Sequence, residues 1–302
     1  MQLRLDAADR LVELVEERRG PIAVEEAART VLKLGHAVPV GLARSLLDEA
    51  VVADARLRWA GDFVGLADAP VVPADPERSH EAIARLVGEV VDAGALPVTL
   101  GGDHSITESC VAAVAARRGP VGLIHFDTHT DTGREVFGVE RSHGTPMFRL
   151  VEAGRVPGAR YAQIGLRGYW PGPAEFAWQR EQGIASFFMH DVRDLGIREV
   201  TARALAHVGA GLVYVTVDVD VLDPAFAPGT GTPEPGGMTS VDLLWAVREI
   251  AASVELAGAD VVEVLPTAIG SADITALVAE RVVREMLTGL ALRSSRARTA
   301  SA

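Results

Sequence analysis

Apolar runs and amphipathic stretches alternate along the chain after residue 78. Apolar runs, most of them with Val, Ile or Leu and one with two phenylalanines, occur near residues 96–100, 121–127, 161–166, 185–189, 212–220 and 260–265. Such runs are typical of strands buried on both faces within a parallel sheet. The spacing of apolar residues predicts helices over residues 79–93 and 106–116, and further helices between the later strands. We therefore expect an α/β protein in which helices cover a mainly parallel sheet, in three α/β/α layers.

The first 65 residues follow a different pattern. Helical spacing recurs over residues 6–17, 24–34 and 39–52, and residues 56–66 resemble a hairpin. Three helices and a hairpin outline a small winged-helix-like module over residues 1–66. Residues 67–78 are rich in Pro, Asp and Ala and predict a linker, residues 79–293 a larger α/β domain, and residues 294–302 a disordered tail.

The composition of this module does not favour DNA binding. Its third predicted helix offers Arg44 against Asp48 and Glu49, and residues 1–65 contain more acidic than basic residues. A helix that reads DNA would carry a basic patch instead. We expect the module to act in packing or dimerisation.

Polar side chains follow three of the predicted strands at the points where the strands end. They include the carboxylates and imidazoles of His104, Asp127, His129, Asp131, Asp218 and Asp220. In an extended chain alternate side chains share a face, so the residues spaced at i and i+2 are expected to point the same way. Ligands of an open parallel sheet bind at the carboxyl ends of its strands. The three stretches are therefore predicted to form one polar site.

A metal centre is the expected occupant of such a site. Carboxylates at close range raise one another's pKa, and burial penalises each charge. The four aspartates carry four negative charges, which two divalent cations would neutralise. With two neutral imidazole nitrogens beside them, this oxygen-rich ligand set favours Mn²⁺, with Zn²⁺, Co²⁺ and Fe²⁺ as alternatives.

Charge and cysteine content narrow the function further. The chain has 41 acidic and 29 basic residues and a formal net charge of −12, which disfavours nucleic acid and anionic membranes as partners and suits a cationic substrate. Cys110 is the only cysteine, so a disulfide framework is excluded and a reducing compartment is favoured. We expect Cys110 to be a buried small hydrophobe. The start of the chain reads as neither a signal peptide nor a membrane span, and the predicted location is the cytoplasm.

Five short motifs occur in order along the larger domain. They are GGDHS (residues 101–105), DTHTD (127–131), SHGT (142–145), DVDVLDP (218–224) and DVVEV (260–264). In order and spacing they resemble the ureohydrolase family of arginase and agmatinase, over about residues 70–293. The resemblance implies an arginase-like fold, a ureohydrolase catalytic domain over residues 79–293, and a homo-oligomer, trimeric or hexameric.

The resemblance also implies a binuclear manganese site. One ion is expected on His104, Asp127, Asp131 and Asp218, and the other on His129, Asp127, Asp218 and Asp220, so that Asp127 and Asp218 bridge the ions. A hydroxide between the ions would attack the guanidinium carbon of the substrate and release urea and an amine.

Two further residues acquire roles from the resemblance. His143 is expected to contact the substrate and to relay a proton near the leaving nitrogen, a task that suits a side chain with a pKa near neutrality. Glu263 is expected to bind the guanidinium through a charge-assisted pair. Asp103 is expected either to orient the metal ligands or to cap a helix.

Several other polar residues are interpreted as structural. Asp223 precedes Pro224 and is expected in a turn, whereas Glu234 is a loop carboxylate or a substrate-side one. His125 is expected to point away from Asp127, as a satisfied core residue. The histidines that lie away from the motifs are His36, His80, His190 and His207.

The sequence does not determine which guanidine compound is the substrate. It looks closer to agmatinases than to arginases, and the acidic balance makes agmatine the first-choice substrate. Guanidinobutyrate or guanidinopropionate would instead need a basic group, and the candidates for it are Arg134, Arg141, Arg149 and Arg167. A metal-dependent deacylase is disfavoured because its motifs lack the second Asp-x-Asp pair.

The chain departs from the family at its start. The first strand and its loop, which carry a Gly-x-Pro-like signature in the family, have no counterpart here, and the helical module stands in their place. The expected consequence is an unpaired edge of the sheet, a reduced stability or an altered pocket. A catalytically impaired protein that binds a guanidine as a sensor is the alternative to an enzyme.

Overall fold

The computed structural model describes residues 68–72, 75–169, 171–265 and 273–300. Within them lies a six-stranded sheet with the order β1-β6-β5-β2-β3-β4, in which every neighbouring pair is parallel. The strands are β1 (Val98–Leu100), β2 (Gly122–Phe126), β3 (Tyr161–Leu166), β4 (Ala185–Phe188), β5 (Leu212–Asp218) and β6 (Glu255–Val262). The predicted fold class is confirmed.

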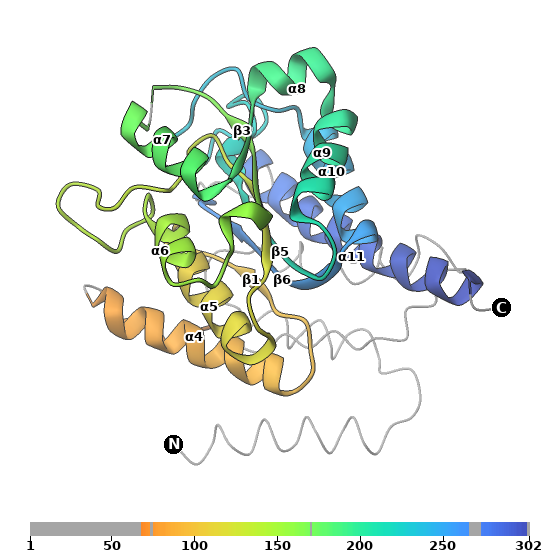
Figure 1. Ribbon diagram of the computed structural model, residues 1–302, viewed down its shortest axis with the longest axis horizontal. Coiled ribbons are helices and arrows are strands. Elements are labelled where there is room, and N and C mark those ends of the chain that lie inside the picture. The colour runs from red at the N-terminus through yellow and green to blue at the C-terminus, as the bar shows by residue number, and fades with distance from the viewer. Residues whose placement is uncertain (1–67, 73–74, 170, 266–272, 301–302) are drawn as a thin grey trace. The chain divides into compact units, whose positions relative to one another are not determined.

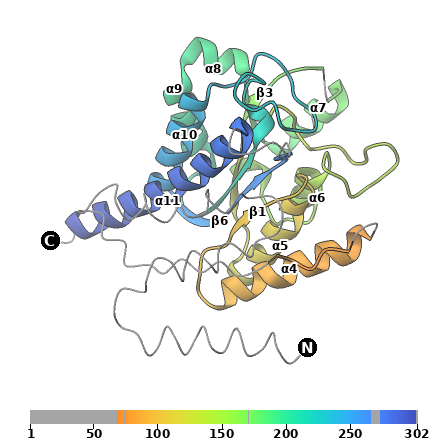
Figure 2. The same cartoon turned by 180° about the vertical axis from the view of Figure 1, so that it is seen from behind.

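Helices cover both faces of the sheet (Figures 1 and 2). On one face, α4 (Pro76–Asp92), α5 (Ile106–Arg118) and α6 (Pro146–Glu152) share a buried core with Leu123 and Tyr161. On the other, α8 (Met189–Leu195), α9 (Ile197–Val208), α10 (Ser240–Ser253) and α11 (Ile274–Ala300) pack on Ile124 and Val215. Side chains that are adjacent in a strand thus enter different cores, which explains why these strands are apolar on both faces.

The remaining elements are short. They are the helix α7 (Pro173–Gln182) and the single turns η1 (Gly158–Arg160) and η2 (Val219–Val221). Within the described ranges, each helix is too short or too polar to cross a membrane.

The helix boundaries differ from the predicted ones at two places. Helix α4 begins at Pro76, inside the predicted linker, because the Asp75 side chain accepts a hydrogen bond from the Arg78 amide and Pro76 occupies the first helical turn. Helix α11 continues to Ala300, where a disordered tail was expected from residue 294. The chain has no Gly or Pro after Gly289 to end this helix.

The last strand begins earlier than predicted, at Glu255 rather than near residue 260, and ends at Val262. Gly258 in its middle hides the strand pattern, because glycine is unfavourable in strands. A Cβ at this position would lie 2.6 Å from Cε2 of Tyr214, so the tyrosine ring requires the glycine.

The expected winged-helix-like module of residues 1–66 lies outside the described residues, as does part of the predicted linker. Of the described strands, only β6 pairs with β1, so β1 forms an edge of the sheet as this part of the chain shows it.

Candidate active site

The side chains of the three acidic and histidine-rich motifs meet at the carboxyl end of the sheet. His104 Nδ1 lies 2.9 Å from Asp127 Oδ2, 2.9 Å from Asp131 Oδ2 and 3.3 Å from Asp218 Oδ2. All four side chains are buried. This group contains the four residues predicted to hold the first ion.

A second group shares Asp127 with the first. His129 Nδ1 lies 3.0 Å from Asp220 Oδ2 and 3.4 Å from Asp127 Oδ1. The ligand atoms of these three residues lie close enough together to hold one cation. The Asp218 carboxylate reaches the second group through Oδ1, which accepts a hydrogen bond of 2.8 Å from the Asp220 amide. The two oxygens of Asp127 therefore face different groups of ligands.

These residues leave the regular strands before they converge. Strand β2 ends at Phe126, so Asp127, His129 and Asp131 lie in the loop that follows it. Asp131 has a left-handed backbone (φ 49°), a conformation that aspartate tolerates better than most residues. Asp220 lies in the turn η2 after β5. Loop geometry, rather than alternation along an extended strand, brings the carboxylates together.

The hydrogen bonding of the two ring nitrogens of His104 indicates whether the site suits a metal. His104 Nε2 pairs with Thr216 Oγ1 at 2.9 Å, which leaves Nδ1 as the atom that faces the carboxylates. Nδ1 is buried and meets the geometry of a hydrogen bond with none of the described groups, although three carboxylate oxygens surround it. A neutral imidazole nitrogen among carboxylate oxygens is a ligand set that binds divalent transition metals. The residues present therefore fit a metal centre.

The pKa shifts of the clustered residues also favour a bound cation. Burial and the charges of Asp220 and Asp127 raise the pKa of Asp218 well above its usual value. Burial and the charge of Asp127 raise the pKa of Asp220 to about 7. Burial lowers the pKa of His129, but hydrogen bonds to Asp127 and Asp220 outweigh it and raise that pKa to about 11. The carboxylates repel one another, and a cation bound among them would relieve that repulsion.

A second layer of buried polar residues supports His104. Thr216, which pairs with Nε2 of His104, lies beside Thr107, and Thr107 donates to Asp260 Oδ2 at 2.9 Å. Tyr214 donates to the same oxygen at 3.0 Å. Burial raises the pKa of Asp260, while its hydrogen bonds and the charge of His104 act against that rise. Thr107, Thr216 and Tyr214 were missed in the sequence because they look like ordinary helix and strand residues.

His125 corrects one of the predictions. It is a buried, satisfied core residue as expected, but it does not point away from Asp127: its Nε2 lies 2.8 Å from Asp127 Oδ2. Asp127 directly follows β2 and stands two positions after His125, and side chains at i and i+2 of an extended segment point the same way. The Nδ1 atom of His125 lies 2.8 Å from the Tyr161 hydroxyl.

Glu263 follows β6 directly and joins the GGDHS motif. Its amide donates to the Gly102 carbonyl at 2.9 Å, and its Oε1 accepts from the His104 amide at 2.8 Å. Its backbone is left-handed (φ 61°), which is uncommon for a residue other than glycine and is often found at functional sites. Burial raises the pKa of Glu263. The Glu263 carboxylate is thus held beside the His104 group.

His143 and Asp103 lie at the edge of the cluster. His143 is exposed, and its charge acts to lower the pKa of Glu263 against the larger effect of burial. Among the described contacts, His143 forms no hydrogen bond or ion pair with the six converging residues. Asp103 accepts a hydrogen bond from the Ser105 amide at 2.9 Å and so supports the turn before α5. Asp223 also holds a turn, as expected, by accepting from the amides of Ala225 and Gly236.

Three of the four arginines considered for substrate recognition are engaged elsewhere. Arg141 pairs with Glu77 and Glu108, and Arg149 lies 3.1 Å from Glu108 Oε2. Arg167 donates to backbone carbonyls that include those of Asp220 and Glu234.

The fourth candidate, Arg134, is exposed. It stacks over the Phe148 ring at 4.6 Å and has no acidic partner among the described residues.

Known proteins are similar to this chain in sequence and in fold. Residues 18–289 match the Arginase family. A guanidinopropionase from Pseudomonas aeruginosa is 45% identical over 233 residues, which make up 76% of this chain and 72% of that protein. A mitochondrial agmatinase from Gallus gallus is 40% identical over 201 residues, 66% of this chain and 58% of that protein, so the chain spans less than two thirds of that relative. A solved structure of a hypothetical agmatinase from Burkholderia thailandensis has 31% identity and a TM-score of 0.72, with 87% of this chain and 85% of that chain covered. The family match and the identity to these relatives lead to one conclusion, that the chain belongs to the arginase family.

Proposed function

We propose that this amidinohydrolase holds two divalent metal ions and hydrolyses a linear guanidine to urea and an amine, with agmatine as the first-choice substrate. The observation that carries the proposal is the pair of ligand groups that share Asp127, one around His104 Nδ1 and one around His129 Nδ1. A shared carboxylate with one oxygen in each group suits a binuclear centre.

The ligands are assigned from this geometry. His104 and Asp131 would hold one ion and His129 and Asp220 the other, with Asp127 and Asp218 shared. Bound divalent ions would supply a nucleophile at neutral pH by lowering the pKa of a water. Mn²⁺ is the proposed metal because carboxylate oxygens outnumber the imidazole nitrogens.

Glu263 is proposed to bind and orient the guanidinium. Its Oε1 is anchored by the His104 amide at 2.8 Å, and the carboxylate carries the negative charge that a guanidinium needs. This hydrogen bond ties the Glu263 carboxylate to the backbone of His104, whose side chain is a proposed metal ligand, and so limits movement between them. A carboxylate fixed in this way presents the planar carbon of the substrate in one orientation.

His143 is proposed to move the proton. It is exposed at the edge of the cluster, close enough to Glu263 for its charge to act on that carboxylate. A histidine in this position can receive a proton from the attacking water and deliver it to the departing nitrogen.

Charge supports agmatine over a guanidino acid. Arg141, Arg149 and Arg167 are bound to protein groups, so they are not free to receive a substrate carboxylate. The net charge of −12 favours the second cation of agmatine. Guanidinopropionate is the second candidate, because Arg134 has no acidic partner among the described residues and a relative of 45% identity is a guanidinopropionase.

A substrate panel tests the proposal. The Mn²⁺-loaded protein is incubated with agmatine, 3-guanidinopropionate, 4-guanidinobutyrate and arginine, and kcat/KM is obtained from the urea released. We expect agmatine to give the highest value and Arg134→Met to leave it unchanged. A higher value for guanidinopropionate that Arg134→Met abolishes would favour the second candidate. Binding of a guanidine without any urea would favour the sensor instead.

The proposal also includes an oligomeric state and a cellular location. The family resemblance suggests a homotrimer or homohexamer, which light scattering coupled to size-exclusion chromatography would measure. The single cysteine and acidic composition suit the cytoplasm.

A further inference from the structure

Two buried hydrogen bonds in series connect the Tyr161 hydroxyl, the His125 ring and the Asp127 carboxylate. His125 Nε2 lies 2.8 Å from Asp127 Oδ2, and His125 Nδ1 lies 2.8 Å from the Tyr161 hydroxyl. All three side chains are fully buried. The two rings come from neighbouring strands, since Leu123 of β2 is in register with Tyr161 of β3.

The distances assign the direction of each hydrogen bond. The Tyr161 hydroxyl has one proton and two neighbouring acceptors, His125 Nδ1 at 2.8 Å and Gln163 Oε1 at 3.4 Å. The shorter contact is the stronger bond, so Tyr161 donates to Nδ1. The imidazole proton then resides on Nε2, which donates to Asp127 Oδ2. The opposite tautomer would aim a lone pair at a carboxylate oxygen.

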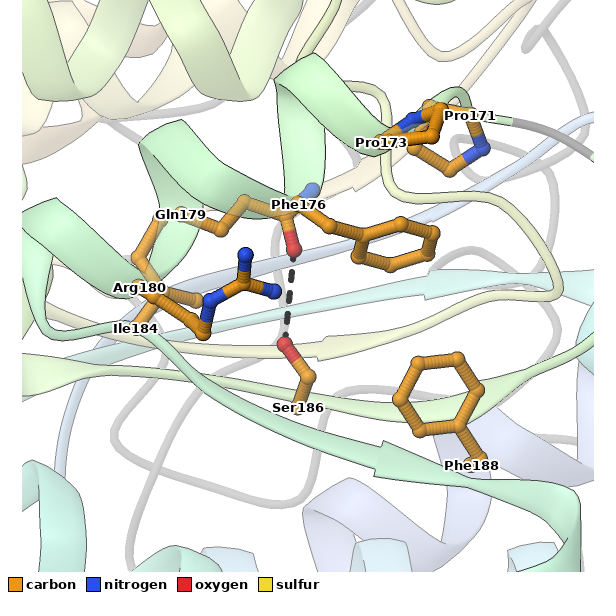
Figure 3. Close-up of a pocket in the computed structure, with 8 residues that line it drawn as sticks. All are labelled: Pro171, Pro173, Phe176, Gln179, Arg180, Ile184, Ser186 and Phe188. Carbon is orange, nitrogen blue, oxygen red and sulfur yellow. Dashed lines mark hydrogen bonds between the residues drawn. The ribbon is translucent and has the colours of Figure 1, made fainter.

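Gln163, the second neighbour of the Tyr161 hydroxyl, is held by hydrogen bonds of its own. Gln163 Nε2 donates to Gln179 Oε1 at 2.7 Å and to Ser186 Oγ at 2.8 Å. Gln179 and Ser186 line a pocket of about 640 Å³ between α7 and β4, where their side chains face each other (Figure 3). These bonds connect β3, β4 and α7 and hold the Gln163 side chain, whose Oε1 lies 3.4 Å from the Tyr161 hydroxyl.

We propose that His125 and Tyr161 are positioning residues, which hold the Asp127 carboxylate so that its two oxygens serve both halves of the metal site. This inference rests on the proposed function, because it concerns the centre assigned there. Asp127 Oδ1 already accepts from the His129 amide at 2.5 Å. With His125 on Oδ2, each oxygen has a protein donor that fixes the rotation of the carboxylate. Groups that orient a metal ligand in this way typically change metal affinity by about 10- to 100-fold.

A different reading would make His125 a metal ligand itself. Its atoms lie within the same compact group as those of His104, Asp127 and Asp131. Both of its ring nitrogens are engaged, however, one by the Tyr161 hydroxyl and one by Asp127. His104 Nδ1 is the ring nitrogen of that group that lacks a hydrogen bond among the described residues. The geometry therefore assigns donation to His125 and ligation to His104.

The test measures metal binding rather than turnover. Tyr161→Phe, His125→Leu and His125→Gln are prepared as full chains, stripped with EDTA and titrated with Mn²⁺, and bound Mn²⁺ is followed by electron paramagnetic resonance. We expect Tyr161→Phe and His125→Leu to weaken binding by about 10- to 100-fold and to change the spectrum. His125→Gln places an amide donor near the Nε2 position and is expected to recover much of the affinity. Melting temperatures in EDTA identify any variant that is merely misfolded.

The outcomes separate this inference from the proposed function. Wild-type affinity and an unchanged spectrum in Tyr161→Phe would overturn the inference even if the wild-type protein released urea. If Tyr161→Phe bound normally while His125→Leu and His125→Gln both lost one ion, His125 would be a ligand and the inference would also fall. Weakened Mn²⁺ binding in the variants of a protein that releases no urea would support the inference and refute the proposed reaction.

Discussion

Replacing Glu263 by glutamine separates the charge of this side chain from its shape. Oε1 of Glu263 accepts the His104 amide at 2.8 Å, and the glutamine oxygen can accept the same bond. The variant should therefore keep the loop and the metal ligands in place. What it loses is the negative charge that would pair with the guanidinium of the substrate.

The size of the loss follows from the bond type. Hydrogen bonds to charged groups contribute about 1.5–3 kcal/mol, which corresponds to a fall in kcat/KM of roughly 10- to 150-fold. Urea released from agmatine by the Mn²⁺-loaded variant provides kcat and KM separately. Bound Mn²⁺ and the melting temperature serve as controls, and both should match the wild type.

Two results would refute this reasoning. Wild-type kcat/KM in Glu263→Gln would mean that the carboxylate does not bind the guanidinium. Loss of Mn²⁺ from the variant would mean that Glu263 acts mainly on the metal site. Glu263→Asp is the matched control for charge, because it keeps the carboxylate but shortens its reach to the His104 amide.

Three further predictions concern stability. Chelation by EDTA is expected to lower the melting temperature, and Mn²⁺ at about 100 times its Kd to restore about 2.7 kcal/mol per site; a melting temperature indifferent to EDTA would contradict the metal centre. Burial and the charge of Arg141 lower the pKa of His80 against three nearby carboxylates, so the neutral ring stabilises the fold fully above about pH 6.5 and less as the pH falls below that value. His80→Asn should flatten this dependence in EDTA-treated protein unfolded with urea at pH 5 and pH 7.5, and an unchanged slope would exclude His80 as its source. Gly258→Ala brings a Cβ to 2.6 Å from the Tyr214 ring and should cost about 1–3 kcal/mol in urea unfolding, whereas Gly102→Ala, with open space around its Cβ, should cost less than about 0.5 kcal/mol; equal stabilities of the two variants would argue against this close packing.

The sequence predicted where the site lies for reasons that were only partly correct. Charge counting and the rule for strand ends brought His104, Asp127 and Asp218 together, as the structure does. The assumption of an extended chain through Asp131 failed, because β2 ends at Phe126 and Asp131 adopts a left-handed backbone. The residues still converge, because the loops that carry them follow parallel strands whose carboxyl ends lie at the same edge of the sheet.

The residues that support the candidate metal ligands could not be identified from the sequence pattern. Tyr161 and Asp260 look like parts of apolar strands, and their partners lie on other elements. The contact between Tyr161 and His125 depends on the register of β2 and β3, which no local spacing reveals. The start of β6 was missed for a similar reason, since the glycine that accommodates Tyr214 weakens the strand pattern.

The strand order has a consequence for how the protein is made. Strands β1 and β2 are neighbours in the chain, but β5 and β6, from its last third, lie between them in the sheet. A nascent chain on the ribosome can assemble β2, β3 and β4 early, while β1 must wait for β6 to emerge before it has a partner among the described strands. Such long-range pairing slows folding and leaves apolar edges open meanwhile. His104 is therefore expected to join the aspartates only after β6 has emerged, and a truncated product that lacks β6 should neither bind divalent metal ions at this site nor resist proteolysis.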